Sequence, residues 1–572
     1  MPARKTAALD AHVAVVGAGP IGMTLAGRLA QRGLRVVLLE QHPRHTGEGS
    51  KALCMQRETL EIWARLGIGE RVAERGVQWQ VGRTYFRDRE LFSIQLPGSG
   101  EEHFPGFVNI NQTEVEELLL ERLGELSNVE LRWSHRLTGL SQDVDGVTLV
   151  CDTPEGERVL RVGYAVGTDG AHSAVRHLLG VGFPGHSHED LFLICDIRAR
   201  LPFPNERHFH FDPPWNPGRQ VLVHPQPDDT WRIDWQVPSG TDVEAERASG
   251  ALDRRIRQVV GATTGYELAW VTVYRFHQRL ATRFRVGRVL LAGDAGHLMS
   301  PFGARGLNSG AADAENLAWK LAMVLDGRAP ESLLDSYEVE RRAAAEENLA
   351  VTEASMRFMV PHGPLQRLAR NAILRGSVRS TFLRRRVNSG KLSQPFSYAA
   401  SPVIAAPHAD ERLPRHGEVA PDARCTAMDG GKHAVTRLRD LLGDAFVVLL
   451  ICRTPPDAAA AMAIRAAGLS WPVPAHIAAV GPDMPLKDVM VLRDPYGDLA
   501  RIYGAAGSRA WLIRPDGHLA GSVTLPARDA VDRLPALQAL AIGERHAVAA
   551  AAAPERREGV RNLIRQRARR AG

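Results

Sequence analysis

A glycine-rich turn near the start of the chain constrains the fold more than any other feature. The valine-rich run from Val13 to Val16 predicts a buried parallel strand. Gly17, Gly19 and Gly22 follow in a G-x-G-x-x-G pattern, and the third glycine falls within an apolar-periodic helix. Such glycines permit a tight turn, close approach to a diphosphate and close packing of helix on strand. We therefore expect a dinucleotide-binding β-α-β unit.

The residues around this turn favour the same ligand. Pro20 begins the helix, whose N-terminus offers free N–H groups and a positive dipole end to a diphosphate. A second strand ends at Glu40, where a carboxylate can accept hydrogen bonds from a ribose diol, and Gln41 follows as a further cofactor residue. The alternative is a strand, turn and helix with no ligand.

A second strand, glycine-rich turn and long helix lies between Arg288 and Ala322. Its strand ends near Asp294, at the edge where open α/β sheets bind ligands. NAD needs only one glycine fingerprint, so two distant ones favour a flavin dinucleotide held at both ends. The cofactor residues predicted here are Asp294, Pro301, Gly306, Leu307 and Asn308.

Two further motifs complete the pattern. The stretch Gly167-Thr-Asp-Gly-Ala-His-Ser-Ala-Val-Arg176 resembles the D-G segment of the FAD-dependent aromatic hydroxylases, the group A flavoprotein monooxygenases. The stretch beginning Asn111-Gln-Thr-Glu resembles the family's helix whose early Gln touches the flavin. The resemblance covers residues 12 to about 340. It implies cofactor contacts from Gln112, Asp169, Gly170 and Arg176, and places the D-G segment near the incoming nicotinamide nucleotide.

The resemblance implies an enzyme that uses FAD, NAD(P)H and O₂ to hydroxylate a phenolic or other activated aromatic substrate. The oxidising species would be a flavin C4a-hydroperoxide. The phenylpropionate, phenol and aromatic polyketide hydroxylases look most similar, because they share a C-terminal domain. Two alternatives stay open. One is a flavin oxygenase that performs epoxidation or Baeyer–Villiger insertion on a polycyclic polyketide, and the other is a non-catalytic flavoprotein carrier.

The loop around Pro301 supplies the catalytic candidates. By resemblance, the Pro301 carbonyl would lie near the flavin C4a region. The helix that begins near Leu307 would direct N–H groups at flavin N1 and C2=O, where a helix N-terminus stabilises an anion by about 0.3–2 kcal/mol. His297 is a candidate base for the phenol proton, with a structural role as the alternative. Arg305 could meet an acidic substrate group, contact an FAD phosphate or cap the loop.

One departure from the family concerns a cation. Lys51 stands where relatives carry an arginine near the flavin phosphates and ribitol. Arg44 is a second candidate partner for a phosphate. A solvated surface cation is the alternative for both.

Short aromatic strands separated by Pro and Gly turns predict an antiparallel sheet between about 181 and 277. By resemblance, this sheet covers the isoalloxazine and forms one wall of an aromatic pocket. Residues 231–236 alternate between an apolar and a polar face, and the pattern does not tell which face meets substrate. The substrate candidates are His210, His224 and Trp235, and a structural role is the alternative for the histidines.

The predicted fold is α/β. A Rossmann-like FAD-binding domain comprises residues 1–76, 106–180 and 278–395, and a β-sheet substrate domain (α+β) comprises 77–105 and 181–277. A linker at 396–406 precedes a region, 407–545, that resembles a thioredoxin-like domain without C-x-x-C. Within it, Phe446–Ile451 predicts a buried strand and Arg514–Gly517 a hairpin turn. An Ala/Arg-rich tail ends the chain at 546–572.

Composition narrows the partners and the setting. The net charge is only +6, with 71 Lys and Arg against 65 Asp and Glu, and the basic tail lacks interleaved aromatics, so we expect no nucleic-acid partner. The five cysteines show no metal-ligand spacing, which predicts no metal and a reduced, cytoplasmic setting. No apolar run approaches the ~20 residues of a membrane span. We expect a small aromatic substrate and leave a homodimer open.

Overall fold

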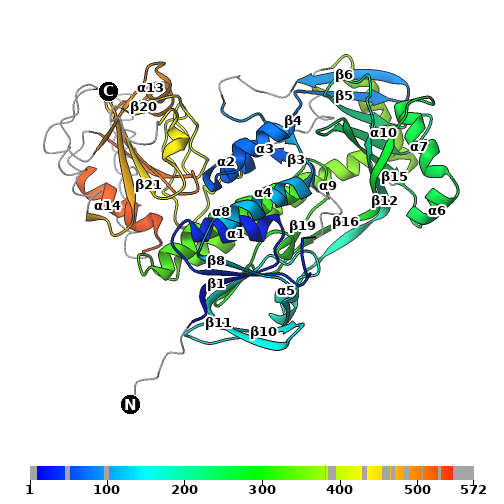
Figure 1. Ribbon diagram of the computed structural model, residues 1–572. Coiled ribbons are helices and arrows are strands. Elements are labelled where there is room, and N and C mark those ends of the chain that lie inside the picture. Colours follow the sequence, from blue (N-terminus) through cyan, green and yellow to red (C-terminus); the bar gives the residue numbers. More distant parts are fainter. Residues whose placement is uncertain are drawn as a thin grey trace, which may run out of the picture. The chain divides into compact units, whose positions relative to one another are not determined.

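The computed structural model describes residues 9–45, 52–95, 102–361, 363–380, 382–383, 394–427, 435–453, 464, 470–481, 489–505, 507–525 and 530–544. They form a mixed α/β fold with several sheets (Figure 1). The chain divides into two compact units: unit 1 comprises residues 1–318 and 341–394, and unit 2 comprises 319–340 and 395–572. No helix among the described residues is both long enough and apolar enough to cross a membrane.

The first sheet of unit 1 is built on the predicted β-α-β unit. β1 (Ala11–Val16) is almost fully buried and pairs in parallel with β2 (Val36–Leu39) and β11 (Gly156–Gly167). Parallel strands continue on both sides, because β8 pairs with β2 and β18 pairs with β11. The remaining strands of this sheet are β8 (Val129–Arg132), β9 (Arg136–Gln142), β10 (Val147–Thr153), β17 (Arg285–Val286) and β18 (Val289–Leu291). Strands β9 and β10 pair as an antiparallel hairpin.

Helix α1 packs against β1, β2 and β8 of this sheet, and α4 and α2 pack against α1 (Figure 1). Pro20 lies at the first helical position of α1, as proline at a helix start commonly does. The first five helices of unit 1 are α1 (Pro20–Ala30), α2 (Arg57–Leu66), α3 (Gly69–Arg75), α4 (Gln112–Gly124) and α5 (Ala174–Leu178). The small sheet consists of β3 (Cys54–Gln56), β4 (Val77–Gln78) and β7 (Phe107–Asn109).

The predicted antiparallel sheet is confirmed and is wider than residues 181–277. β5 and β6 join its edge, where β5 pairs with β13 in parallel, and β19 joins the opposite edge. Its order is β19 (His297–Leu298), β16 (Glu267–Leu280), β12 (Gly185–Arg198), β15 (Thr230–Val237), β14 (Gln220–Pro225), β13 (Arg207–Phe211), β5 (Val81–Phe86) and β6 (Arg89–Gln95).

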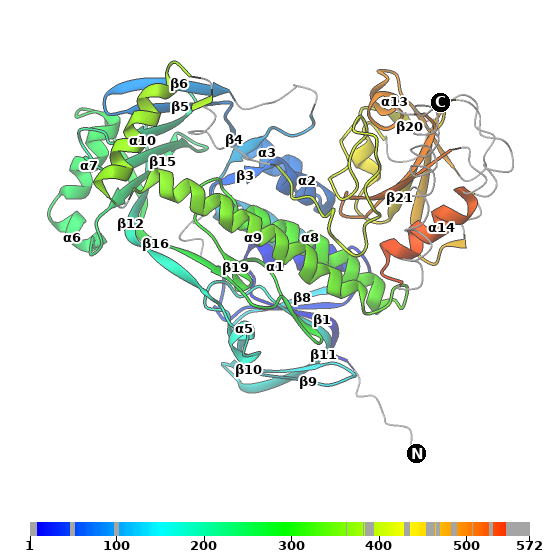
Figure 2. The ribbon, with the colours of Figure 1, turned by 180° about the vertical axis from the view of Figure 1, so that it is seen from behind.

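The two faces of this second sheet have different partners. One face packs on the helices α6 (Val243–Ala248) and α7 (Ala251–Val260), which lie outside it in Figure 1. The other face contributes phenylalanines to a cluster that includes Phe302 from the second glycine-rich loop. That cluster also includes residues of α9 (Leu333–Met359) and α10 (Pro364–Ser377), and α10 lies beside β6 (Figure 2). The face of the sheet opposite α6 and α7 is therefore the one that packs against the second glycine-rich loop.

Unit 2 contains a six-stranded sheet. β21, β22 and β23 are parallel, and β24 and β25 form an antiparallel hairpin. The predicted buried strand and the predicted hairpin turn at Arg514–Gly517 are both confirmed. The order is β20 (Thr426–Ala427), β23 (Met490–Arg493), β22 (Ala475–Val480), β21 (Phe446–Ile451), β24 (Arg509–Ile513) and β25 (Leu519–Thr524). Its helices include α13 (Asp498–Tyr503) and α14 (Ala530–Ala541).

The segment predicted as a linker is part of this unit. Tyr398, Val403 and Ile404 are buried in its apolar core, so residues 396–406 pack against the sheet. The last turns of α8 (Gly306–Leu325) and the first of α9 also belong to unit 2. The Ser, Pro and Gly content of this stretch predicts a linker. Composition does not report tertiary packing, so it could not show that these residues are buried.

A buried ionic cluster holds these pieces of unit 2 together. The Arg514 guanidinium donates to both carboxylate oxygens of Glu340 at 2.7 and 2.9 Å, and Lys320 donates to the same carboxylate at 2.7 Å. All three side chains have 0% exposure. Burial alone would raise the pKa of Glu340, but Arg514 and Lys320 hold it well below its ordinary range.

Candidate functional site

Three loops meet at the carboxyl ends of β1, β11 and β18. A Cβ built on Gly17, whose φ is +104°, would lie 2.7 Å from the Cα of Asp169. Thr168 Oγ1 donates to the Gly17 carbonyl at 2.9 Å. The first glycine-rich turn is therefore packed against the D-G segment, at the edge where parallel sheets bind ligands.

The second glycine-rich loop joins the same edge. The Ala292 N–H donates to the Gly167 carbonyl at 2.9 Å. A Cβ on Gly310 would lie 2.7 Å from Ile21 Cδ1 and 3.2 Å from the Cα of Gly293. Helix α8 thus packs closely on the first turn of α1, so tertiary structure brings motifs nearly 300 residues apart into contact.

Two glycines at helix starts border open space, and this fits an extended dinucleotide. Gly19 is the N-cap of α1, and Gly306 is the first residue of α8. A Cβ built on either would meet no described atom within 4 Å, whereas one on Gly22 would lie 1.9 Å from the Gly17 carbonyl oxygen. The first N–H groups of a helix lack intrahelical acceptors. Two such N-termini can therefore hold the diphosphate and the flavin end of FAD.

Glu40 keeps the capacity expected of a ribose acceptor. Its two carboxylate oxygens accept the N–H groups of Ala18 and His42 at 2.9 and 3.0 Å. Each oxygen retains a lone pair for another donor. Gln41 and Arg44 follow on an exposed segment, and Lys51 lies outside the described residues.

Asp169 and Arg176 make structural contacts around the D-G segment. Asp169 accepts the Val175 N–H at 3.1 Å and the Ser173 hydroxyl, which caps α5, and burial raises the pKa of Asp169. Arg176 donates to the Ala295 carbonyl at 3.0 Å and thereby links this segment to the Asp294 loop. Gly170, with φ +78°, again borders open space. Cofactor contact by these residues stays a prediction.

The loop before α8 is held tightly by side chains. Ala304 adopts φ +52°, which is uncommon for a residue other than glycine, and its N–H donates to the Pro301 carbonyl at 2.9 Å. The Asn308 amide donates to the carbonyls of Cys54 and Ala304 at 2.9 and 2.6 Å. Its oxygen accepts the Gln56 N–H at 2.9 Å. Asn308 therefore fixes the loop through its side chain, and only its backbone is left to serve a cofactor.

Leu307 and Asp294 are half-buried. Burial, and then the charge of Asp294, raises the pKa of Tyr274 on β16, so Asp294 lies within electrostatic reach of the second sheet. At the start of α4, the Gln112 side chain accepts the Ala52 N–H at 3.1 Å and donates to Glu116 at 2.8 Å. A flavin contact by Gln112 stays a prediction.

The surroundings of His297 favour its structural alternative. The side chain has 0% exposure, and its Nε2 lies 2.8 Å from Asp313 Oδ2. Asp313 also accepts Arg341 Nε at 2.6 Å and the Gly293 N–H at 2.9 Å. This enclosed network leaves the predicted role as a base without support. Arg305 is buried too and donates to Asn348 on α9, which ties the loop to that helix.

The three substrate candidates do not share a face of the second sheet. Cross-strand pairing places His210, Val221 and Trp235 on one face. Trp235 is fully buried in the apolar cluster with α7, and the His210 ring stacks on Tyr85 at 4.5 Å. The substrate predictions for Trp235 and His210 are thus without support, because the alternation could not say which face is covered by helices.

His224 lies on the other face of the sheet. Two polar residues that the sequence analysis did not select, Arg207 and Asp234, lie on the same face. His224 stands opposite Arg232, and Leu222 stands opposite Asp234. Burial lowers the pKa of His224 well below its ordinary value. The charged residues within the 231–236 alternation could have pointed to this face. Charged side chains on an otherwise apolar strand are rarely buried without a partner.

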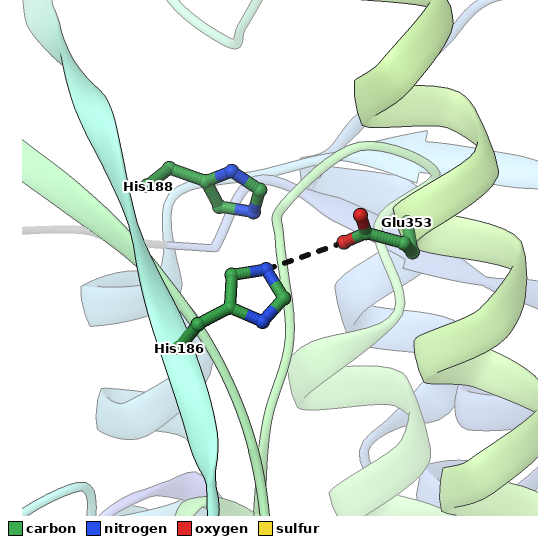
Figure 3. Close-up of side chains that lie close together, drawn as sticks. All are labelled: His186, His188 and Glu353. Carbon is green, nitrogen blue, oxygen red and sulfur yellow. Dashed lines mark ion pairs between the residues drawn. The ribbon is translucent and has the colours of Figure 1, made fainter.

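Among the residues that the structure describes, one group could hold a metal ion. His186 and His188 on β12 and Glu353 on α9 place their ligand atoms within 4.8 Å of one another (Figure 3). His186 Nε2 lies 3.4 Å from Glu353 Oε2, and the His186 side chain is 55% exposed. Glu353 also accepts Arg357 Nε at 3.1 Å. Two of the three members, His186 and Glu353, therefore already take part in ion pairs.

Comparisons agree with this geometry. A family described as an FAD binding domain matches residues 10–352. A 3-(3-hydroxy-phenyl)propionate/3-hydroxycinnamic acid hydroxylase of Mycolicibacterium smegmatis is 29% identical over 559 residues, which cover 93% of each chain. A 12-dehydrotetracycline 5-monooxygenase/anhydrotetracycline 6-monooxygenase of Streptomyces rimosus is 35% identical over 362 residues, covering 61% of this chain and 70% of that protein.

Solved structures show the same likeness. The flavin-dependent monooxygenase PieE in complex with FAD and substrate has a TM-score of 0.77 and 25% identity, and the match covers 94% of this chain and all of that one. Aklavinone-11 hydroxylase with FAD and aklavinone has a TM-score of 0.76 and 26% identity, with 94% and 99% covered.

Proposed function

Because this chain belongs to the FAD binding domain family, we propose that it is an FAD-dependent monooxygenase that uses NAD(P)H and O₂ to hydroxylate a phenolic or other activated aromatic substrate. The observation that carries the proposal is the convergence of two helix N-termini, at Gly19 and Gly306, beside one sheet edge. The names of the relatives as hydroxylases and monooxygenases support the same reaction.

When bound, FAD supplies the redox chemistry that activates O₂, and the protein supplies binding and electrostatics. The α1 N-terminus around Gly19 and Pro20 would hold the diphosphate, and Glu40 the adenosine ribose. The α8 N-terminus at Gly306 and Leu307 would stabilise negative charge on the flavin by about 0.3–2 kcal/mol. Asp294, in the short 3-10 helix Gly293–Ala295 that follows β18, would bind the ribitol chain.

The second sheet would exclude water from the reacting ring. Phe192 and Phe276 contact Phe302, the residue after Pro301, with ring centroids 5.6 and 5.8 Å apart. This aromatic layer lies between the sheet and the loop that would carry the flavin. Such a layer suits an apolar aromatic substrate and lowers the local dielectric around developing charge.

We also propose the finer architecture. Unit 1 would hold a Rossmann-like FAD-binding domain with the antiparallel sheet inserted as substrate domain. Three parallel strands, an antiparallel hairpin and a terminal helix support a thioredoxin-like domain in unit 2. The boundary after the FAD-binding domain would then fall near residue 395, with 396–406 assigned to unit 2. A cytoplasmic setting fits the five cysteines, all of which are unpaired.

The test is turnover by the purified, FAD-loaded protein. Phenolic acids should stimulate NAD(P)H oxidation, and isotope-labelled O₂ should place one labelled oxygen atom in the product. Chromatography and mass spectrometry of the product would separate ring hydroxylation from epoxidation or ring insertion. A reduced flavin that is stable in air, with no product from any aromatic substrate, would contradict the proposal and favour the carrier alternative.

A further inference from the structure

We propose that Arg207 and Asp234, with His224 beside them, recognise an anionic substituent of the aromatic substrate, a carboxylate above all. The inference rests on the proposed function, because it names the substrate class of that site. It assigns to the enzyme an acidic aromatic substrate rather than a neutral polycyclic one.

The three side chains present buried polar atoms without partners. Arg207 Nε, Asp234 Oδ1 and His224 Nδ1 form no hydrogen bond within the part of the chain that the structure describes. A buried donor or acceptor left unsatisfied costs about 1–3 kcal/mol, so native proteins rarely keep one without a reason. Three on adjacent strands of one sheet face indicate a missing ligand.

The charges around these atoms favour an anion. Arg232 on the same face is already neutralised, because it donates to both oxygens of Asp196 at 2.8 and 2.7 Å. Among the described residues no carboxylate forms an ion pair with Arg207, although Asp234 lies within electrostatic reach. Burial raises the pKa of Asp234 to about 7, so this carboxyl can hold a proton near neutral pH. Arginine stays charged, so a partly buried positive charge is left without a carboxylate partner among the described residues.

A substrate carboxylate would satisfy this arrangement. One of its oxygens would accept the Arg207 Nε–H, and protonated Asp234 would donate to the other. Burial lowers the pKa of His224, so its imidazole is neutral and adds no competing charge. Hydrogen bonds that involve a charged group are the stronger kind, which suits substrate selection.

The position of the site also suits an aromatic acid. The Arg207 guanidinium lies 5.6 Å from the centroid of the Phe209 ring, and Phe209 belongs to the aromatic cluster that contains Phe302. On another side, the charges of Arg207 and Asp234 act on Cys54, whose carbonyl accepts the Asn308 amide. An anion and its attached ring would thus lie between the sheet and the start of α8.

The experiment compares one acid with its neutral amide. Calorimetric titration of the FAD-loaded protein, without NAD(P)H, should show that 3-hydroxyphenylacetate binds more tightly than its primary amide. Arg207→Met should weaken binding of the acid roughly tenfold to a hundredfold, the range of hydrogen bonds to charged groups, and leave the amide nearly unchanged. Arg207→Lys should restore part of the loss, since it keeps the charge.

Arg198→Met is the matched control. Arg198 lies at the end of β12 in the same sheet, with its side chain 58% exposed beside Glu267. This variant should bind both compounds like the parent protein. FAD content and melting temperature establish that each variant is folded. Asp234→Asn is a second test: its amide keeps a hydrogen-bond donor, so this variant should still bind the acid.

Equal affinity of the parent protein for acid and amide, or no binding of either, would overturn the inference. So would an Arg207→Met protein that is folded and loses affinity for both compounds equally. Because this experiment measures no turnover, its result is independent of the hydroxylation test. Acid-selective binding without hydroxylation would contradict only the proposed function, and hydroxylation without acid-selective binding would contradict only this inference.

Discussion

At Gly19 the absence of a single Cβ leaves the α1 N-terminus accessible. Gly19 has an ordinary φ of −75°, so its backbone does not need glycine. Gly22 differs, because its Cβ would meet the Gly17 carbonyl oxygen at 1.9 Å. The same motif therefore contains one glycine that borders open space and one that is required for packing.

We expect Gly19→Ala to weaken FAD binding at least about tenfold, or about 1.4 kcal/mol, with the FAD-free stability unchanged. The reason is that the new methyl group would occupy space needed by the diphosphate. Fluorescence titration with FAD and thermal unfolding of the FAD-free protein would measure the two effects. Gly124→Ala, at another open position on the end of α4, should change neither the affinity nor the fold.

A folded, FAD-free Gly19→Ala protein with parental affinity would show that the diphosphate lies elsewhere. Gly22→Ala should instead lose roughly 1–3 kcal/mol of stability even without FAD, as overpacked sites do.

Helix α8 connects the candidate flavin site to the rest of unit 1. Asp313, one turn beyond Ser309, accepts hydrogen bonds from His297, Arg341 and the Gly293 backbone. Burial alone would raise the pKa of Asp313, but Arg341 and His297 lower it, so the carboxylate is charged. One side chain thereby fixes the loop before α8 and the helix α9.

Asp313→Asn should destabilise the protein by about 3–5 kcal/mol, because it leaves the buried Arg341 charge without its carboxylate. FAD affinity should fall with it, since an amide keeps only one acceptor oxygen for Arg341, His297 and the Gly293 backbone. Denaturant unfolding and FAD titration would measure the change. Asp152→Asn, at an exposed position near the end of β10, removes the surface ion pair with Arg136 and should have no measurable effect.

Parental stability in folded Asp313→Asn protein would contradict the view that this carboxylate organises the loop.

The whole molecule consists of two units with separate buried polar cores. The Glu340 carboxylate in unit 2 accepts from Arg514, Lys320 and the Ser401 hydroxyl, the last at 2.6 Å. Trp319 donates to Asp516, which pairs with the same arginine. None of these groups belongs to unit 1, so their loss should act first on the stability of unit 2.

We expect Glu340→Gln to cost unit 2 about 3–5 kcal/mol, since it breaks a buried ion-pair network from one side. Differential scanning calorimetry should show an earlier transition, while FAD binding to the folded protein is retained. Asp410→Asn, which removes an exposed pair with Arg412 in the same unit, should leave the transition where it is. If the Glu340→Gln protein lost FAD at temperatures where unit 2 is still folded, the substitution would be acting on FAD binding directly and not through the stability of unit 2.

The sequence by itself determined the local elements and the order of the motifs. Gly17, Glu40 and the valine run predict a β-α-β unit because turn chemistry and strand hydrophobicity act over a few residues. The buried strand at Phe446–Ile451 and the hairpin at Arg514–Gly517 are local in the same sense.

Tertiary structure alone decided which face of the second sheet is available. The alternation places Trp235 and Asp234 on opposite faces but does not tell which face is covered by helices. Only the packing of α7 against Trp235 shows that the face of Trp235 is the covered one. The partners of His297 and the burial of residues 396–406 likewise depend on segments distant in the chain. Burial and unpartnered atoms, the features that single out Arg207, exist only once those segments have come together.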